Sequence, residues 1–253
     1  MIKSDGIAVA TTHNQGDKMK TILLLVALVV AGVWVVPVSA KNYVSGDIGM
    51  VWLNNVADSY STSNYAYPMF FQTNYNNRLV FDNSGITMLA ALGSECGNYR
   101  IEGELGYQRN NLKNFTSNIS SAGSFLPSTR VTNLDGNASV ISILANGYYD
   151  IHPGGIDPYI TAGIGVASIN FNDINSPASS LQYRGSSAND QVTAIAYQIG
   201  AGVAIPLSDT VKLDARYRYF STGKIGGITT SQLTISDFNI ISNSVLLGLR
   251  VDI

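Results

Sequence analysis

Eight charged residues make up the densest charged group of this sequence and are the first candidates for chemistry. They are Arg100, Glu102, Glu104, Lys212, Asp214, Arg216, Arg218 and Arg250. Neighbouring members recur at every second position, so they share one face of an extended strand. Such rows can supply a carboxylate pair for acid–base work or line an ion-selective channel. We expect a third arrangement, a buried lumen network of paired opposite charges, because unpaired buried charges cost several kcal/mol each.

Other catalytic and metal-binding residue types are scarce. Cys96 is the single cysteine, which excludes an internal disulfide and argues against a zinc cluster. A hydrolase or acyl transferase needs a nucleophile, a base and an orienting acid. His152 is the one histidine of 41–253, and it lies in a predicted turn far from the long loops. A histidine-based triad facing the outside is therefore unavailable, whereas an aspartate-based site in the loops stays open. We therefore expect no enzyme, no cofactor and no metal.

An export signal precedes the charged residues. Met19 and Lys20 are followed by an apolar run, 22–36, and then by Val38-Ser39-Ala40. This is the order of a positive region, a hydrophobic region and a small-residue cleavage site. We expect 1–18 to be a leader or an over-extended start, 19–40 a signal peptide cleaved after Ala40, and 41–253 one folded domain. A membrane anchor is the alternative for the run, but a span usually needs about 20 apolar residues.

Alternating apolar and polar residues predict eight strands in the domain. They cover about 43–53, 85–95, 98–109, 137–151, 157–170, 191–205, 211–220 and 240–253. The connections between them are alternately long and short, and the long ones are 54–84, 110–136, 171–190 and 221–239. With the export signal, this rhythm predicts an all-β, eight-stranded antiparallel up-and-down transmembrane barrel, with tight turns in the periplasm and long polar loops outside.

The alternation also assigns the two faces of each strand. In 240–253, Val245, Leu247 and Leu249 share one parity, and Ser244 and Arg250 share the other. We predict that the apolar parity faces lipid. The charged parity then faces the lumen, which is narrow enough in an eight-stranded barrel for side chains to fill it.

Seven aromatic residues lie near predicted strand ends. They are Trp52, Tyr148, Tyr149, Tyr159, Tyr217, Tyr219 and Phe220. Aromatic belts are typical of both membrane–water interfaces, so we interpret these residues as an interfacial girdle. A carbohydrate or ligand platform is the alternative.

Several strands resemble a known family. The segments PYITAGIGVA (158–167), AYQIGAGVA (196–204) and LDARYRYF (213–220) resemble the second half of the bacterial outer-membrane β-barrel family that includes rickettsial-type surface antigens, opacity-like proteins and the OmpA-type membrane domain. YRIEGELGY (99–107) is similar to that family's third strand. The resemblance implies a surface barrel in a Gram-negative outer membrane with variable exposed loops. Such barrels commonly end in an aromatic residue that resembles part of the assembly signal, and this sequence has Ile253 there.

The expected function is that of a monomeric, non-enzymatic surface barrel with a structural, antigenic or adhesive role. Its expected partners are outer-membrane lipid, the barrel assembly machinery and a host or environmental ligand at the loops. A narrow porin-like channel lined by the lumen charges is one alternative, and a periplasmic lipocalin-like barrel with an apolar interior is another. The net charge of −2 gives no electrostatic case for nucleic acid.

Overall fold

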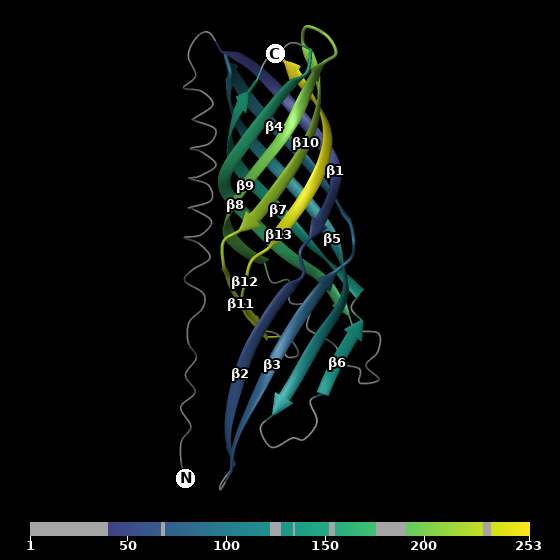
Figure 1. The fold of residues 1–253 in the computed structure, drawn as a ribbon, viewed down its shortest axis with the longest axis vertical. Helices are drawn as coiled ribbons and strands as arrows, with labels where there is room; N and C mark the ends of the chain where they lie inside the picture. The colour runs from purple at the N-terminus through teal and green to yellow at the C-terminus, as the bar shows by residue number, and fades with distance from the viewer. Residues whose placement is uncertain are drawn as a thin grey trace.

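The computed structural model describes residues 40–66, 69–121, 128–133, 135–151, 155–175, 191–229 and 234–253. The predicted leader, the signal peptide up to position 39, and His152 lie outside these residues. Regular secondary structure in the described part consists of β-strands (Figure 1). Among the same residues, no helix has the length and hydrophobicity that crossing a membrane requires.

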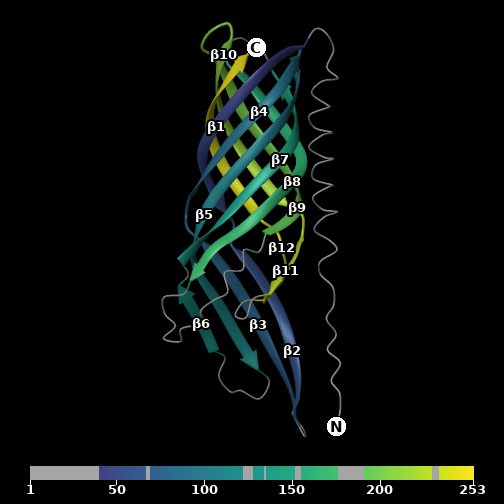
Figure 2. The same ribbon diagram turned by 180° about the vertical axis from the view of Figure 1, so that it is seen from behind.

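Eight strands close into an antiparallel barrel, as the sequence predicts. They are β1 (Lys41–Leu53), β4 (Gly85–Cys96), β5 (Tyr99–Ser121), β7 (Asp135–Asp150), β8 (Asp157–Asn175), β9 (Gln191–Pro206), β10 (Val211–Thr222) and β13 (Ile241–Asp252). Each strand pairs with the next in this order, and β13 pairs with β1 to complete the ring. The strands run obliquely around the barrel, which both views show (Figures 1 and 2).

The two ends of the barrel differ in the length of their connections. One end, called here the turn end, carries the two-residue turn 97–98 and the short connection 207–210. Gly97 has a φ of 59°, a left-handed conformation that a tight hairpin turn uses and that glycine adopts without steric cost. The opposite end, called the loop end, carries the long connections.

Five further strands occupy connections that the sequence predicts to be loops. They are β2 (Val56–Ala66), β3 (Met69–Phe81), β6 (Ser128–Asn133), β11 (Ile225–Thr229) and β12 (Thr234–Phe238). The β2–β3 hairpin and β6 pair with the outer part of β5, forming an extension sheet beyond the barrel (Figure 1). These connections are long, as predicted, but their described residues form strands that the sequence did not predict. Both parities of segments such as VADSYSTSNYA are mostly polar, so alternation gives no signal.

The outer face of the barrel is apolar. Each barrel strand exposes large hydrophobic residues on this face: Ile48, Leu92, Leu105, Ile141, Ile164, Ile195, Tyr217 and Leu247 are examples. Leu247 is 58% exposed, whereas Leu246 next to it is buried inside. The prediction that Val245, Leu247 and Leu249 share the outer face of β13 is therefore confirmed. A continuous exposed apolar band of this kind suits lipid. It contradicts the lipocalin-like alternative, which required an apolar interior and a polar exterior.

An apolar cluster fills the barrel at the loop end. Barrel strands contribute buried inward side chains such as Leu53, Leu144 and Phe220. The connections add Leu79 from β3 and Phe238 from β12. The strands outside the barrel therefore pack over its opening, and the polar part of the lumen lies between this cluster and the turn end.

Candidate functional site

The polar lumen is the candidate functional site, and its charges come from opposite walls of the barrel. Glu102 and Glu104 point inward from β5, and Arg216 and Arg218 point inward from β10. In the ring of eight strands, β5 and β10 are four places apart, so they face each other. All four side chains are buried.

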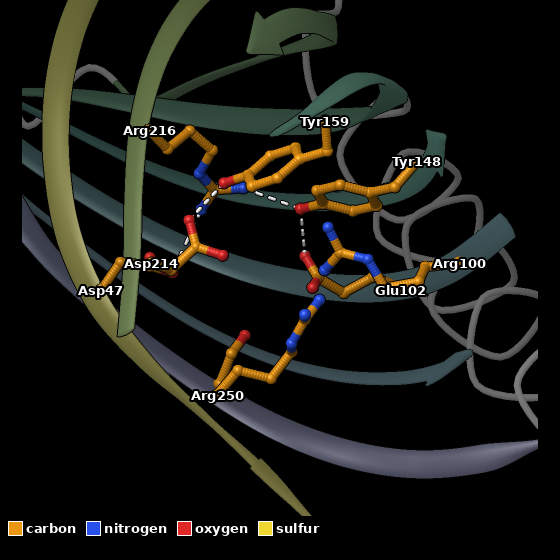
Figure 3. Close-up of a pocket in the computed structure, with 9 residues that line it drawn as sticks. Asp47, Arg100, Glu102, Tyr148, Tyr159, Asp214, Arg216 and Arg250 are labelled. Atoms are coloured by element: carbon orange, nitrogen blue, oxygen red, sulfur yellow. Dashed lines mark hydrogen bonds and ion pairs between the residues drawn. The ribbon is translucent and has the colours of Figure 1, made fainter. Parts of the chain in front are cut away.

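Glu104 forms ion pairs with both Arg216 and Arg218. Its Oε2 lies 3.4 Å from Arg216 Nη1, and its Oε1 lies 3.3 Å from Arg218 Nη2. Arg216 also reaches β1, where its Nη2 lies 3.1 Å from Oδ2 of Asp47 (Figure 3). Since guanidinium groups donate several hydrogen bonds in fixed directions, Arg216 can bind two carboxylates at once. These contacts connect three strands of the barrel across its interior.

Two amides complete the surroundings of the central carboxylates. Asn146 Nδ2 donates to Glu104 at 3.0 Å and to Glu102 at 3.3 Å. Gln198 Nε2 donates to Asn146 Oδ1 at 2.6 Å, and Gln198 Oε1 accepts from Arg218 Nε. The amides bring β7 and β9 into the network. Buried charges that are hydrogen-bonded in this way avoid much of the cost of desolvation.

A layer of arginine and tyrosine lies closer to the turn end. Arg100 binds Asp150 with two hydrogen bonds, of 2.6 Å from Nε and 2.9 Å from Nη2. Its Cζ lies 4.1 Å from the ring centroid of Tyr148 and 4.9 Å from that of Tyr159. This geometry combines a bidentate ion pair with cation–π contacts, both of which favour arginine over lysine.

Tyrosine hydroxyls bind the remaining carboxylates of this layer. Tyr148 donates to Glu102 Oε1 at 2.7 Å, and Tyr43 donates to Glu102 Oε2 at 3.0 Å. Tyr159 donates to Asp214. Figure 3 shows Tyr148 and Tyr159 pointing into the lumen beside Arg100, with Arg216 on the other side of the tyrosine hydroxyls.

Glycines opposite the tyrosines make room for their rings. A Cβ atom at Gly93 would lie 2.3 Å from Cζ of Tyr43, its partner across β1 and β4. A Cβ atom at Gly202 would lie 2.4 Å from the hydroxyl of Tyr159. Real carbon atoms do not approach this closely, so these glycines permit large residues on the neighbouring strand, as expected for a narrow lumen filled by side chains.

Arg250 and Lys212 lie apart from the central contacts. Arg250 is buried, with Cζ 5.4 Å from the ring centroid of Tyr43, and its Nε and Nη1 have no hydrogen-bond partner among the described residues. Lys212 sits at the rim of the turn end, where its Nζ lies 3.8 Å from Glu95 and 4.0 Å from Asp157. Among the described residues, Arg250 therefore lies in the lumen without an ion pair, whereas Lys212 forms long contacts at the edge of the lumen.

A small cavity lies among these side chains. Its volume is about 10 Å³, and its lining includes Ser45, Asp47, Tyr159, Asp214 and Arg250. That is about the space of one water molecule. In the described part of the chain, no group of histidine, cysteine and acidic residues is arranged to hold a metal ion.

Three aromatic residues assigned to the girdle are inside the barrel, so that assignment is wrong for them. Tyr148, Tyr159 and Phe220 are 5%, 2% and 1% exposed and point inward. Their parity is the signal that could have placed them. Tyr148 alternates with outward Tyr149, and successive side chains of a strand point to opposite faces.

Sequence reasoning also missed two acids and one tyrosine of the lumen. Asp47 and Asp150 bind Arg216 and Arg100, and Tyr43 binds Glu102. Asp47 and Asp150 have no charged residue of the same parity within four positions, and Tyr43 is uncharged, so none of the three stands out in a charged row. Their inward parity was readable from the strand pattern, but their partners come from strands distant in sequence.

Comparison with known proteins identifies the family. A model of a family described as "surface antigen" matches residues 39–235, most of the chain. The chain belongs to the surface antigen family. Outer membrane protein PagN of Salmonella typhimurium is 29% identical over 98 residues, which are 37% of this chain and 38% of PagN. The chain thus matches well under half the length of this relative.

Solved structures similar to this chain include two bacterial proteins of low sequence identity. Neisserial surface protein A has a TM-score of 0.47 and 19% identity, with 85% of this chain and 99% of that chain covered. Ail, the attachment invasion locus protein of Yersinia pestis, has a TM-score of 0.37 and 13% identity, with 84% and 99% covered. The surface antigen family and the apolar outer face place this barrel in a Gram-negative outer membrane.

Proposed function

We propose that this surface antigen works without catalysis, as a closed barrel that presents its extension sheet and loops to the surroundings of the cell in an antigenic or adhesive role. The observation that carries the proposal is the obstruction of the lumen. The apolar cluster at the loop end, the arginine–carboxylate contacts and the tyrosine layer follow one another along the barrel. The cavity of about 10 Å³ among the polar side chains has room for about one water molecule, which supports a lumen closed to larger solutes.

The proposed orientation places the loop end outside the cell. The turn end has short connections, and the loop end carries the extension sheet and the β11–β12 hairpin. Outer-membrane barrels have short turns in the periplasm and longer loops outside. In this orientation, the extension sheet and the β11–β12 hairpin lie on the exposed side.

The extension sheet is the proposed contact surface. β3 and β6 pair with the two edges of outer β5, and β2 pairs with β3. A paired sheet holds its side chains in fixed positions, so it can bind a partner with less ordering cost than an irregular loop. Serine, threonine, asparagine and tyrosine dominate β2, and β3 adds threonine, asparagine and tyrosine at its centre, a composition suited to polar contacts with a hydrated surface.

An adhesion assay tests this function. Bacteria that display the unmodified chain are compared with bacteria that display a chain in which 58–77 is replaced by a two-residue turn. The shortened chain keeps Val56, Leu79 and Phe81 for the apolar cluster, so heat-modifiable migration on a gel should show a folded barrel. We expect binding to host cells or to specific antibodies to fall to background. Unchanged adhesion and antibody binding by the folded, shortened barrel would refute the proposal.

A further inference from the structure

The outer face of β5 changes character abruptly near the loop end. From Ile101 to Tyr107 its exposed large residues are apolar or aromatic. The next exposed residues on this face are Arg109, Asn111 and Lys113. Aromatic residues mark the interface between hydrocarbon and lipid headgroups. The step from Tyr107 to Arg109 therefore puts the arginine at the level of the headgroups.

An open hollow lies on the outer surface at this level. Met50 on β1, Ile86 on β4 and Arg109 on β5 are neighbours in the strand register. With Ser84 and Asn111, these residues line a hollow of about 470 Å³. Figure 2 shows β1, β4 and β5 next to one another on the side of the barrel that faces the viewer. Met50 and Ile86 are 53% and 50% exposed, so the hollow has an apolar part and a cationic part.

The charges around the hollow favour an anion. Arg109 and Lys113 are exposed cations, and the neighbouring acid is Asp82, whose backbone nitrogen donates to Asn111 oxygen at 2.9 Å. Asp82 Oδ1 already accepts a hydrogen bond of 2.9 Å from the backbone nitrogen of Asn83. None of the ion pairs found among the described residues involves Arg109.

We propose that this hollow binds the phosphate group of an anionic lipid of the outer leaflet. Arg109 holds the phosphate, because its planar fork of donors matches phosphate oxygens. Asn111 and Ser84 offer further hydrogen bonds, and the first part of an acyl chain lies on Met50 and Ile86. The inference rests on the proposed orientation only for the choice of leaflet.

Native mass spectrometry of the full chain in detergent micelles tests the site. The probes are phosphatidylglycerol, lipid A, phosphate-free diacylglycerol and inorganic phosphate. We expect the two phosphate-bearing lipids to bind and the diacylglycerol to bind far less. Arg109→Gln should weaken phosphatidylglycerol binding by on the order of tenfold, as is typical for the loss of a hydrogen bond to a charged group.

Two variants separate this site from general attraction. Lys224→Gln removes an exposed cation between β10 and β11, outside the hollow, and should leave lipid binding unchanged. Met50→Ser keeps the charge and should weaken phosphatidylglycerol binding without affecting any binding of inorganic phosphate. Heat-modifiable migration checks that each variant is folded.

Three results would overturn the site: equal binding by Arg109→Gln and the unmodified chain, equal loss in Lys224→Gln, or binding of inorganic phosphate alone. Micelles have no inner and outer leaflet, so a wrong orientation would leave the effect of Arg109→Gln intact. Failure of the proposed orientation is detected separately, by labelling of Cys96 from outside the cell.

Discussion

Arg216 on β10 and Glu104 on β5 meet across the interior of the barrel, with Nη1 3.4 Å from Oε2, although 112 residues separate them in the chain. Neither residue is adjacent to the other along the hydrogen-bonded ladder, because their strands are on opposite sides of the ring. Their contact therefore holds the two walls together independently of backbone pairing.

Removing Arg216 should destabilise the folded barrel. Arg216→Met leaves Glu104 and Asp47 short of a buried partner, and breaking a buried pair typically costs about 3 to 5 kcal/mol. Urea unfolding in lipid bilayers measures the change in free energy of unfolding. Lys212→Met is the matched control, because Lys212 lies at the rim with contacts of 3.8 and 4.0 Å. Equal stability of the two variants would show that the central contacts contribute nothing.

The unmodified barrel should conduct ions poorly. The charges of opposite walls neutralise one another across the lumen, and the remaining cavity is about 10 Å³. Planar-bilayer recordings measure the conductance, and Arg216→Ala should increase it because the bridge between Glu104 and Asp47 is lost. Large, steady conductance from the unmodified chain would contradict the closed lumen and favour the narrow-channel alternative.

The cost of a charged residue on the outer face should depend on its depth in the membrane. Leu247 lies in the middle of the apolar row of β13, where an arginine should cost about 2 to 4 kcal/mol. Asn243 lies on the same face of the same strand but nearer the loop end. Asn243→Arg should therefore cost about 0 to 1 kcal/mol, as expected near the interface. Folding into bilayers at increasing urea concentrations compares the stability of the two variants. An equal loss of folding free energy in both would show that the assigned membrane level is wrong.

The orientation can be measured through thiol labelling. Cys96 is free and exposed at the turn end, so a membrane-impermeant maleimide should not reach it in intact cells. A Lys224→Cys, Cys96→Ser double variant carries its thiol at the loop end and should be labelled. Labelling of Cys96 before cell lysis would reverse the proposed orientation.

Alternation was enough to predict the barrel because each membrane strand separates lipid from a polar lumen. β10 illustrates this, with exposed Tyr217 between buried Arg216 and Arg218. The strands of the extension sheet could not be found in this way. Outside the membrane no lipid imposes an apolar face, and segments such as β2 are polar at most positions of both parities.

The partners inside the lumen were only partly predictable. The facing of β5 and β10 follows from an eight-stranded ring, which places Glu104 near Arg216. The contact of Arg216 with Asp47, 169 residues away, depends on side-chain reach and on rotamers that no sequence pattern specifies. Tyr148 lies near a strand end, which is typical of girdle residues, but its parity places it inside the barrel.

β5 runs without interruption from Tyr99 at the turn end to Ser121 in the extension sheet. If the extension sheet binds a partner, as proposed, a pull on that sheet would load β5 along its own length. Lengthwise sliding breaks many rungs of the β4–β5 and β5–β7 ladders at the same moment, whereas a sideways pull would open them one after another. In the proposed adhesive role, the long strand would therefore resist a pull along its length.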